Sequence, residues 1–218
     1  MADGPFDAIR PIGSQQVEVA PGLVHHEVFC MGGLLTMLWH GHGEEDGVVV
    51  ALGGAMGGML GPADGLYHDL GVALLEHGIA TIRIGYRRPN DLDECLLDVL
   101  AVLQLAAARG ATKAITMGHS FGGAPAIQAA VVADDLVAGV VTLATQSAGC
   151  EVADRLVGRP VLCFHGDRDQ ILPAVCSELV AGLAGGELVV LPGADHLLAS
   201  AGEQLRTRLL DWIPAVLR

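Results

Sequence analysis

Short apolar runs alternate with longer segments of helical period along most of the chain. Runs of strand length, bounded by glycine, proline or polar residues, predict buried strands. Segments whose apolar residues recur every three or four positions predict amphipathic helices. The predicted strands are Val48–Leu52, Ile79–Ile84, Ala114–Met117, Val137–Leu143, Val161–Phe164 and Leu188–Leu191, and the predicted helices are Leu66–His77, Asp91–Arg109, Ala126–Ala133, Ala174–Leu183 and Glu203–Ile213.

This alternation predicts an α/β fold with a mostly parallel central sheet and helices on both faces. The segments Leu23–Cys30 and Leu34–Trp39 are strand candidates joined by the turn Met31-Gly32-Gly33, which predicts an antiparallel N-terminal hairpin at the sheet edge. At 218 residues the chain is long enough for one domain with a large core, so we expect a single domain over residues 1–218.

Two helices carry specific signals at their starts. Asp91 and Glu94 have the spacing of a capping box at the start of the helix Asp91–Arg109, and Gly110 follows its end. Pro125 lies near the start of the helix that follows Ser120. Because proline is tolerated only in the first turn of a helix, we expect this helix to begin late or to be distorted.

The stretch from Ile115 to Ala124 reads I-T-M-G-H-S-F-G-G-A and leads from an apolar strand through a glycine-flanked serine into a helix. Gly118 and Gly122 stand two residues on either side of Ser120, where strand and helix backbones come close and a side chain would collide. G-x-S-x-G alone is a weak signal, but here the flanking segments predict the strand, turn and helix that the motif requires. We therefore interpret the stretch as a nucleophile elbow.

Two later loops carry the groups that a serine nucleophile requires. A histidine takes the serine proton, and a carboxylate on the far ring nitrogen orients the histidine. The loop after the predicted strand Val161–Phe164 carries Asp167 and Asp169, and the loop after the next strand carries Asp195 and His196. His196 is the predicted base. Asp195 is disfavoured as the acid because it is directly beside His196 in the sequence, which leaves Asp167 and Asp169.

Taken in the order serine, acid, histidine, these segments resemble the α/β-hydrolase superfamily, in particular its small lidless esterases and dienelactone-hydrolase-like members. The acid loop of that family reads H-G-x-x-D and the histidine loop reads G-x-x-H. Both patterns stand here, as His165-Gly166-Asp167-Arg168-Asp169 and Gly193-Ala194-Asp195-His196. The resemblance covers about the whole chain from Val48 onward.

The resemblance implies the α/β-hydrolase fold and a catalytic triad of Ser120, Asp169 and His196. Asp167 is then expected to be structural, paired with a nearby arginine. His119 occupies the x position before the serine of G-x-S-x-G, and because that residue points away from the nucleophile, His119 is expected to be a packing or supporting group. The same is expected of His165 at its strand end.

An oxyanion intermediate requires backbone N–H donors. One is expected from Phe121 at the start of the helix, and the other from the loop Gly53–Met59 after the first central strand. Where the family commonly has His-Gly before the donor, this chain has Gly53-Gly54. Ala55 is then the expected donor and Met56 the alternative, because the missing histidine leaves the exact donor open.

Two other pairs of residues have alternative interpretations. Arg87 and Arg88 follow the strand Ile79–Ile84 at the sheet edge where α/β sites open, so they are candidates for binding an acidic substrate. A solvated turn is the alternative. His40 and His42 suggest a metal, but no third ligand stands at a recognisable zinc spacing, so we expect a polar hairpin turn there and no metal or other cofactor.

Composition narrows the classes of partner and the compartment. A net charge of -13 argues against nucleic acid and anionic membrane surfaces, and the uncharged residues 47–63 are broken by glycines, so we expect a strand and a loop there, not a membrane span. The N-terminus is acidic and lacks an apolar segment, so we expect no signal peptide and a cytoplasmic location. The cysteines follow no pattern and are expected to be reduced core thiols: Cys30, Cys95, Cys150, Cys163 and Cys176.

The expected function is that of a serine hydrolase acting on a carboxylic ester of a small-molecule acyl substrate. Only a short connection separates the strands Val137–Leu143 and Val161–Phe164, so we expect no cap domain and an open site. Thioesterase, lactonase and acyltransferase reactions use the same machinery. The rival is a non-catalytic ligand-binding member of the fold, against which the intact triad counts.

Overall fold

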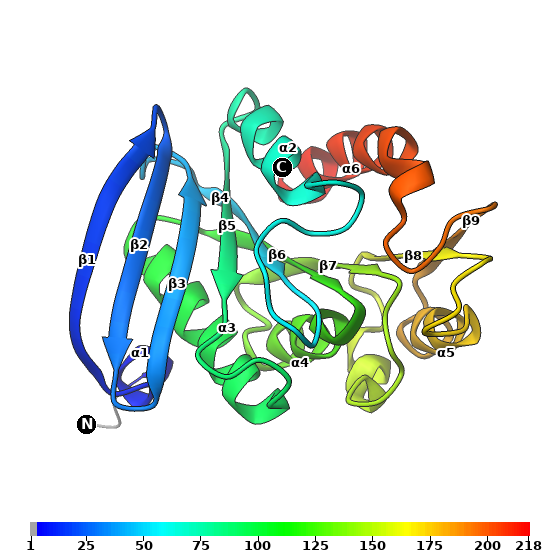
Figure 1. The fold of residues 1–218 in the computed structure, drawn as a ribbon, viewed down its shortest axis with the longest axis horizontal. Helices are drawn as coiled ribbons and strands as arrows, with labels where there is room; N and C mark the ends of the chain where they lie inside the picture. The colour runs from blue at the N-terminus through cyan, green and yellow to red at the C-terminus, as the bar shows by residue number, and fades with distance from the viewer. Residues whose placement is uncertain (1–3) are drawn as a thin grey trace.

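The computed structural model describes residues 4–218, which form one nine-stranded sheet with helices on both faces (Figure 1). In space the strands run in the order β1-β2-β3-β5-β4-β6-β7-β8-β9. Their bounds are β1 (Pro11–Ala20), β2 (Leu23–Cys30), β3 (Gly33–His40), β4 (Gly47–Leu52), β5 (Ile79–Gly85), β6 (Lys113–His119), β7 (Val137–Leu143), β8 (Val161–Gly166) and β9 (Glu187–Leu191).

The sheet confirms the predicted mostly parallel arrangement with an antiparallel N-terminal part. Strands β5, β4, β6, β7, β8 and β9 are parallel, whereas β2 and β3 form the expected hairpin and β3 pairs with β5 in the antiparallel sense. The edge strand β1 lies outside the predicted elements. After its first residue every position of β1 is exposed, including the apolar Ile12, Val17 and Val19, so the strand has no buried face.

Burial on both faces explains why the central strands are continuously apolar. In β4, Val48, Val50 and Leu52 pack in one core, while Val49 and Ala51 between them pack in the other. Successive side chains of a strand point to opposite faces, so a strand between two cores is apolar at most positions on both faces.

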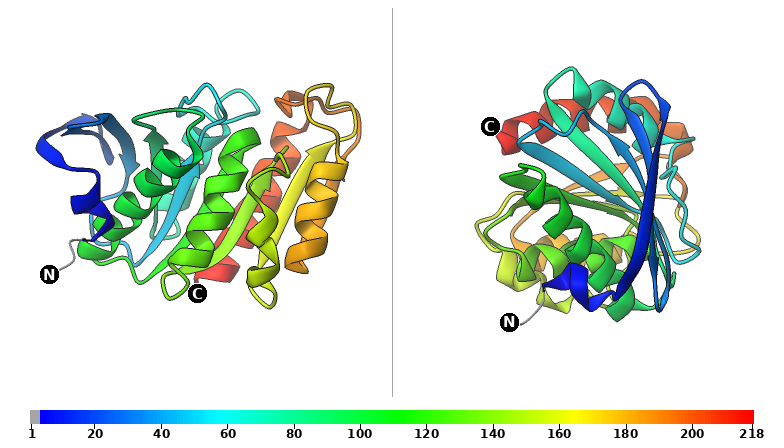
Figure 2. Two further views of the ribbon diagram at one scale, coloured as in Figure 1. Left: turned by 90° about the horizontal axis from the view of Figure 1, so that it is seen from below. Right: turned by 90° about the vertical axis from the view of Figure 1, so that its left-hand side faces the viewer.

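The helices divide between the two faces of the sheet. Helices α2 and α6 cover one face, and α3, α4 and α5 cover the other, as the right-hand view of Figure 2 shows. Short 3₁₀ turns occupy Ser120–Gly122, Glu151–Leu156 and Ala199–Ala201. The helix bounds are α1 (Pro5–Ala8), α2 (Leu66–Leu75), α3 (Leu92–Ala108), α4 (Gly123–Val132), α5 (Val175–Ala184) and α6 (Gly202–Leu217).

Two expected helix starts need correction. Helix α4 begins at Gly123 and not at Ala126, because Pro125 falls in the first turn, where a backbone N–H has no intrahelical partner to lose. At the start of α3 the Asp91 side chain accepts a hydrogen bond from the Glu94 N–H at 3.3 Å. The Glu94 side chain pairs with an arginine and does not reach back to Asp91, so only half of the capping box forms.

The connection from β7 to β8 contains only the 3₁₀ turn Glu151–Leu156, so residues 144–160 hold no cap domain, as expected. None of the helices in residues 4–218 has the combination of length and apolar character that crossing a bilayer requires.

Two buried tyrosines bond to successive carbonyls at the end of β4. The Tyr67 hydroxyl donates to the Leu52 carbonyl at 2.9 Å, and the Tyr86 hydroxyl donates to the Gly53 carbonyl at 3.5 Å. Both rings are nearly inaccessible to solvent, so these bonds fix the point where the strand becomes a loop.

We expect Tyr67→Phe to lower the free energy of unfolding by about 1 kcal/mol, because a buried hydrogen bond is lost while the ring packing is kept. Tyr86→Phe removes a longer and weaker bond, so it is the matched control and should cost less. Urea denaturation of the three proteins measures both effects. An equal loss in the two variants would contradict this order.

Candidate active site

The parallel strands bring three candidate residues to one edge of the sheet. Ser120 follows β6, Asp169 follows β8 and His196 follows β9, and all three strands end at the same edge because they are parallel. Sites in open α/β sheets form at this carboxyl edge.

The turn at Ser120 has the geometry of a nucleophile elbow. Ser120 has φ of +55°, a conformation that non-glycine residues rarely adopt outside strained or functional sites. A Cβ placed on Gly118 would collide with the Gly122 carbonyl, and one on Gly122 would collide with the Leu52 and Gly53 carbonyls. Both glycines are therefore required by close backbone packing, as the sequence predicts.

A line of side-chain contacts runs from Ser120 to Asp169. The Ser120 Oγ lies 3.0 Å from Nε2 of His196, and Nδ1 of His196 lies 2.7 Å from Oδ2 of Asp169. Burial alone would raise the pKa of Asp169, but hydrogen bonds from the Leu172 and Ile171 N–H groups and from His196 lower it below its usual range. The carboxylate is therefore ionised beside the imidazole.

His165 supports Asp169 from the other side. Its Nε2 lies 3.2 Å from Oδ2 of Asp169 and 3.0 Å from the Leu172 carbonyl, and its Nδ1 lies 2.7 Å from the buried Ser177 hydroxyl. When Nε2 carries the proton, the ring donates toward the acid loop and accepts from Ser177. This agrees with the expected supporting role of His165.

His119 contacts the histidine loop. Its Nε2 lies 2.9 Å from the backbone carbonyl of His196, and the two ring centroids are 5.0 Å apart. Burial lowers the pKa of His119, so the ring is neutral and its N–H donates to that carbonyl. His119 thus packs against the loop of the candidate base, as expected for a supporting group.

The two alternative carboxylates bond to the backbone of the histidine loop. Asp167 Oδ1 accepts from the Gly193 N–H at 2.6 Å, and Asp195 Oδ1 accepts from the Leu197 N–H at 3.1 Å. Only Asp169 contacts the imidazole of His196 among the described residues. Asp167 therefore has the structural position expected of it, although its partner is a backbone amide and not an arginine.

A cavity of about 480 Å³ opens at Ser120, a volume within the roughly 300–1,000 Å³ range of small-molecule sites. Its walls come from the loop between β4 and α2, the elbow, and the loops that follow β8 and β9. No lysine, arginine, aspartate or glutamate lines it in the part of the chain that the structure describes. The cavity is lined by Gly53, Gly54, Ala55, Met56, Gly57, Gly58, Met59, Leu60, Gly61, His119, Ser120, Ile171, His196 and Leu197.

The candidate oxyanion donors lie around the same cavity. The N–H of Phe121 belongs to the first turn of a helical run, where backbone N–H groups have no intrahelical partner. Gly54 lies against Ser120, because a Cβ built on Gly54 would be 3.5 Å from Cβ of Ser120. Ala55 follows Gly54 directly, while the Met56 side chain is 95% exposed.

A buried arginine contacts the loop between β4 and α2. Arg83 on β5 donates to the Met59 carbonyl at 3.3 Å and is 3% exposed. Burial lowers the pKa of Arg83. Nothing in the sequence around Arg83 indicates that its side chain contacts the loop of Met59.

The expectation that Arg87 and Arg88 line the pocket is wrong. Arg87 is buried in an ion pair with Asp98, and its second guanidinium nitrogen lies 2.7 Å from Oε2 of Glu94. Arg88 is exposed, and its Nε donates to the Gly32 carbonyl at 3.3 Å. Helix α3 supplies both carboxylates to Arg87, so the charge of that arginine is neutralised inside the fold.

The two histidines after β3 have different environments. His40 is buried beside the ring of His68, and burial together with the charges of Arg83 and His68 lowers its pKa to about 4. The His42 N–H donates to Glu45 in an exposed turn. That turn is not a hairpin, because β5 lies between β3 and β4. Residues 4–218 contain no group of three or more potential metal ligands arranged to hold an ion.

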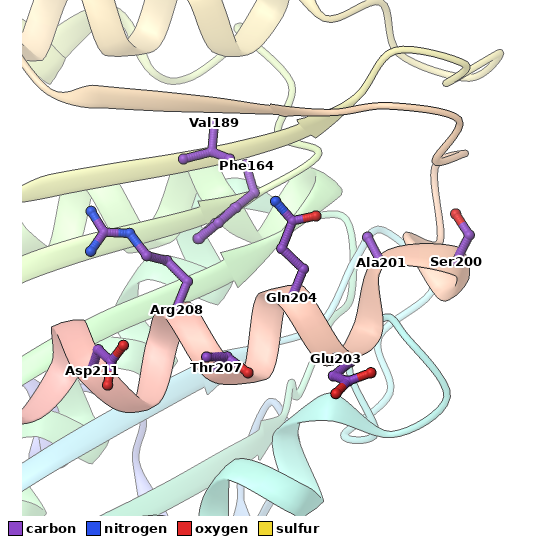
Figure 3. A pocket seen from close by; sticks show the side chains of 9 residues that line it. All are labelled: Phe164, Val189, Ser200, Ala201, Glu203, Gln204, Thr207, Arg208 and Asp211. Atoms are coloured by element: carbon purple, nitrogen blue, oxygen red, sulfur yellow. The ribbon is translucent and has the colours of Figure 1, made fainter.

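A larger cavity of about 690 Å³ lies between α6 and the last two strands (Figure 3). Phe164 and Val189 line its strand side, and Gln204 and Arg208 extend toward them from α6. Arg208 pairs with Glu187 at 2.7 Å. The lining residues include no histidine or cysteine, so this cavity lacks the base that a serine nucleophile requires.

Solved structures of hydrolases resemble the chain closely in fold. Est1E from Butyrivibrio proteoclasticus is 19% identical, with a TM-score of 0.72 over 88% of this chain and 98% of that one. Dienelactone hydrolase from Anabaena variabilis is 17% identical, with a TM-score of 0.74 over 94% and 99%. An alpha-beta serine hydrolase homologue from Coxiella burnetii is 20% identical, with a TM-score of 0.68 over 93% and 98%.

No protein-family model and no curated protein sequence matches the chain. At 20% identity or less, the structural likenesses establish the fold alone. The chain has the α/β-hydrolase fold, which confirms the resemblance drawn from its motifs at that level.

We expect Asp98→Ala to lower the free energy of unfolding by about 3 to 5 kcal/mol, because it leaves the buried charge of Arg87 without its main partner. The neighbouring Arg88→Ala is the control and should change stability by no more than about 0.5 kcal/mol, since its side chain is exposed. Urea denaturation tests both. Similar small losses in the two variants would show that Arg87 is solvated.

Proposed function

We propose that the chain is a serine hydrolase that cleaves a carboxylic ester or a related acyl bond through an acyl-enzyme intermediate. The observation that carries the proposal is the line of contacts from Ser120 Oγ to His196 Nε2 at 3.0 Å and from His196 Nδ1 to Asp169 at 2.7 Å. These distances suit transfer of the hydroxyl proton to the imidazole. The cavity at Ser120 gives a substrate access to the hydroxyl.

In the proposed reaction Ser120 attacks the carbonyl carbon of the ester while Nε2 of His196 takes the hydroxyl proton. The tetrahedral intermediate collapses, the bond from the carbonyl carbon to the alcohol oxygen breaks, and the alcohol leaves with the proton from His196. Water then attacks the acyl-enzyme by the same route, which releases the carboxylic acid and restores the serine hydroxyl.

Asp169 orients the base in this proposal. Its ionised carboxylate accepts the Nδ1–H of His196, which leaves Nε2 free to take the serine proton and stabilises the imidazolium that forms. His165 and the backbone N–H groups of Ile171 and Leu172 hold the carboxylate in position.

The proposed oxyanion donors are the backbone N–H groups of Phe121 and Ala55. Phe121 follows the nucleophile in the first helical turn, where its N–H has no intrahelical partner. Ala55 is preferred over Met56 because it directly follows Gly54, which lies against Ser120.

Thioesters, lactones and acyl transfer fall within the same proposal, because they share the acyl-enzyme chemistry. Solved proteins of this fold include a dienelactone hydrolase and a monoacylglycerol lipase, which supports an acyl bond as the target. We also propose that the protein is a single domain and that it is located in the cytoplasm. The five cysteines are free thiols, as proteins of a reducing compartment usually have.

We expect Ser120→Ala to fold normally and to lower ester turnover by on the order of 10⁴- to 10⁶-fold, because only oxyanion and binding contributions remain. Ser14→Ala, on the exposed edge strand β1 and outside the cavity at Ser120, is the matched control and should keep turnover. The measurement is the hydrolysis of short-chain aryl esters together with labelling by a fluorophosphonate probe. Unchanged turnover in purified Ser120→Ala would overturn the proposed mechanism.

The two aspartates of the acid loop should behave differently. We expect Asp169→Asn to lower kcat by up to about 10⁴-fold, because an amide stabilises the wrong imidazole tautomer. Asp167→Asn weakens a hydrogen bond to the Gly193 N–H, so it should lower the melting temperature and largely keep kcat. Measuring kcat and Tm for both variants tests the assignment, which fails if Asp167→Asn loses turnover while its Tm holds.

A further inference from the structure

Exposed apolar side chains gather around the mouth of the Ser120 cavity. Met56, Leu60, Ile171 and Leu197 are 95%, 66%, 69% and 58% exposed and all line that cavity. They come from three different loops at the carboxyl edge of the sheet. A single exposed apolar residue is common, but a group of them at one cavity marks a surface for an apolar ligand.

Among residues 4–218, none that lines this cavity is a lysine or arginine that could bind an anionic substrate. Arg87 is occupied by Asp98 and Glu94, and Arg83 lies behind the loop, where it donates to a backbone carbonyl. The acid loop carries one exposed cation, Arg168, which is not among the lining residues. The chain as a whole has a net charge of -13, so its field repels anions at low ionic strength.

We propose that the enzyme prefers esters of uncharged, apolar acyl chains of medium length and discriminates against acyl groups that end in a carboxylate. This inference rests on the proposed ester hydrolysis at Ser120. The acyl group stays bound through both acylation and deacylation, whereas the alcohol leaves after the first step. Apolar contacts to the acyl chain therefore contribute in both half-reactions.

In this proposal the cavity walls recognise the acyl chain of the substrate. An acyl chain that leaves the Ser120 carbonyl position crosses a surface formed by Leu60, Ile171 and Leu197, and each methylene that it buries adds favourable transfer free energy. A terminal carboxylate on the same chain must give up water without receiving a hydrogen-bonded cation, which is unfavourable.

The first test compares 4-nitrophenyl esters that share one leaving group. From acetate to octanoate we expect kcat/KM to rise by roughly two- to fourfold per methylene until the chain leaves the apolar walls. Hexanoate and the monoester of adipic acid form a matched pair, because they differ only in a terminal methyl or carboxylate. We expect hexanoate to be preferred at least tenfold, in order of magnitude, and the ratio to narrow as salt is added.

The second test uses variants and reads a ratio, so that changes in folded fraction cancel. Leu60→Ser and Leu197→Ser should lower the ratio of kcat/KM for octanoate to that for acetate by severalfold. Ile12→Ser on β1 is the matched control, because Ile12 is 68% exposed and lies outside the cavity. It should leave the ratio unchanged.

The outcomes separate this inference from the proposed function. Turnover that depends on Ser120 but is independent of chain length, or that favours the adipate monoester, overturns the chain preference and leaves the serine hydrolase intact. A ratio that Leu60→Ser and Leu197→Ser do not change also overturns it. Absence of any ester turnover that depends on Ser120 overturns the proposed function, and this inference with it.

Discussion

The contact between three backbone segments behind Ser120 is the constraint on which the candidate site depends. Gly118 at the end of β6 meets Gly122 in the following helical turn, and Gly122 in turn meets the Leu52 and Gly53 carbonyls at the end of β4. Because the backbone segments at Gly118, Gly122 and the end of β4 are in direct contact, the turn is tight and Ser120 is held at positive φ. A side chain at either glycine would separate the hydroxyl from both His196 and the loop that follows β4. One packing contact therefore sets the position of Ser120 relative to His196 and to the proposed oxyanion donors.

Asp169 stabilises the folded chain in addition to orienting His196. Because hydrogen bonds lower the pKa of Asp169, its ionised form stabilises the folded chain above the unfolded pKa of about 3.9, and this contribution is lost as the pH falls through the lower folded value. The same bonds, from Ile171, Leu172 and His196, fix the direction of the carboxylate. The orientation of the imidazole and the stability of the acid loop thus have one physical cause.

Local sequence signals predict the elements whose burial and turn chemistry leave few alternatives. The central strands are continuously apolar because both faces are covered, and the elbow is recognisable because close backbone contact admits only glycine at Gly118 and Gly122. The edge strand β1 escapes this reasoning, because an exposed strand needs no apolar side. Its place in the sheet comes from local pairing with β2 across the two-residue turn Pro21-Gly22, and not from burial of a side.

Charged residues are harder to assign than apolar ones, because their role depends on partners that are distant in sequence. Arg87 and Arg88 are adjacent and chemically identical, yet Arg87 is buried in an ion pair with Asp98 on α3, whereas Arg88 is exposed. Arg83 interrupts an apolar strand and meets the loop of Met59 only in the folded chain. Ser120, His196 and Asp169 lie in contact as their motifs predict. No motif records the partners of Arg87 and Arg88, so the sequence wrongly suggests cations at the pocket mouth.

An uncapped site must obtain its selectivity from the loops themselves. No domain covers Ser120 within residues 4–218, so water reaches the cavity, and the interactions that distinguish substrates are those of side chains at its rim. These side chains are exposed, and core packing therefore does not determine their identity. The buried residues of the site, such as Gly118, Gly122 and Asp169, are restricted by contacts that the fold needs for its own stability. The proposed chemistry is thus tied to the fold, while the proposed acyl preference depends on residues such as Leu60 and Leu197, which can change without disturbing the fold.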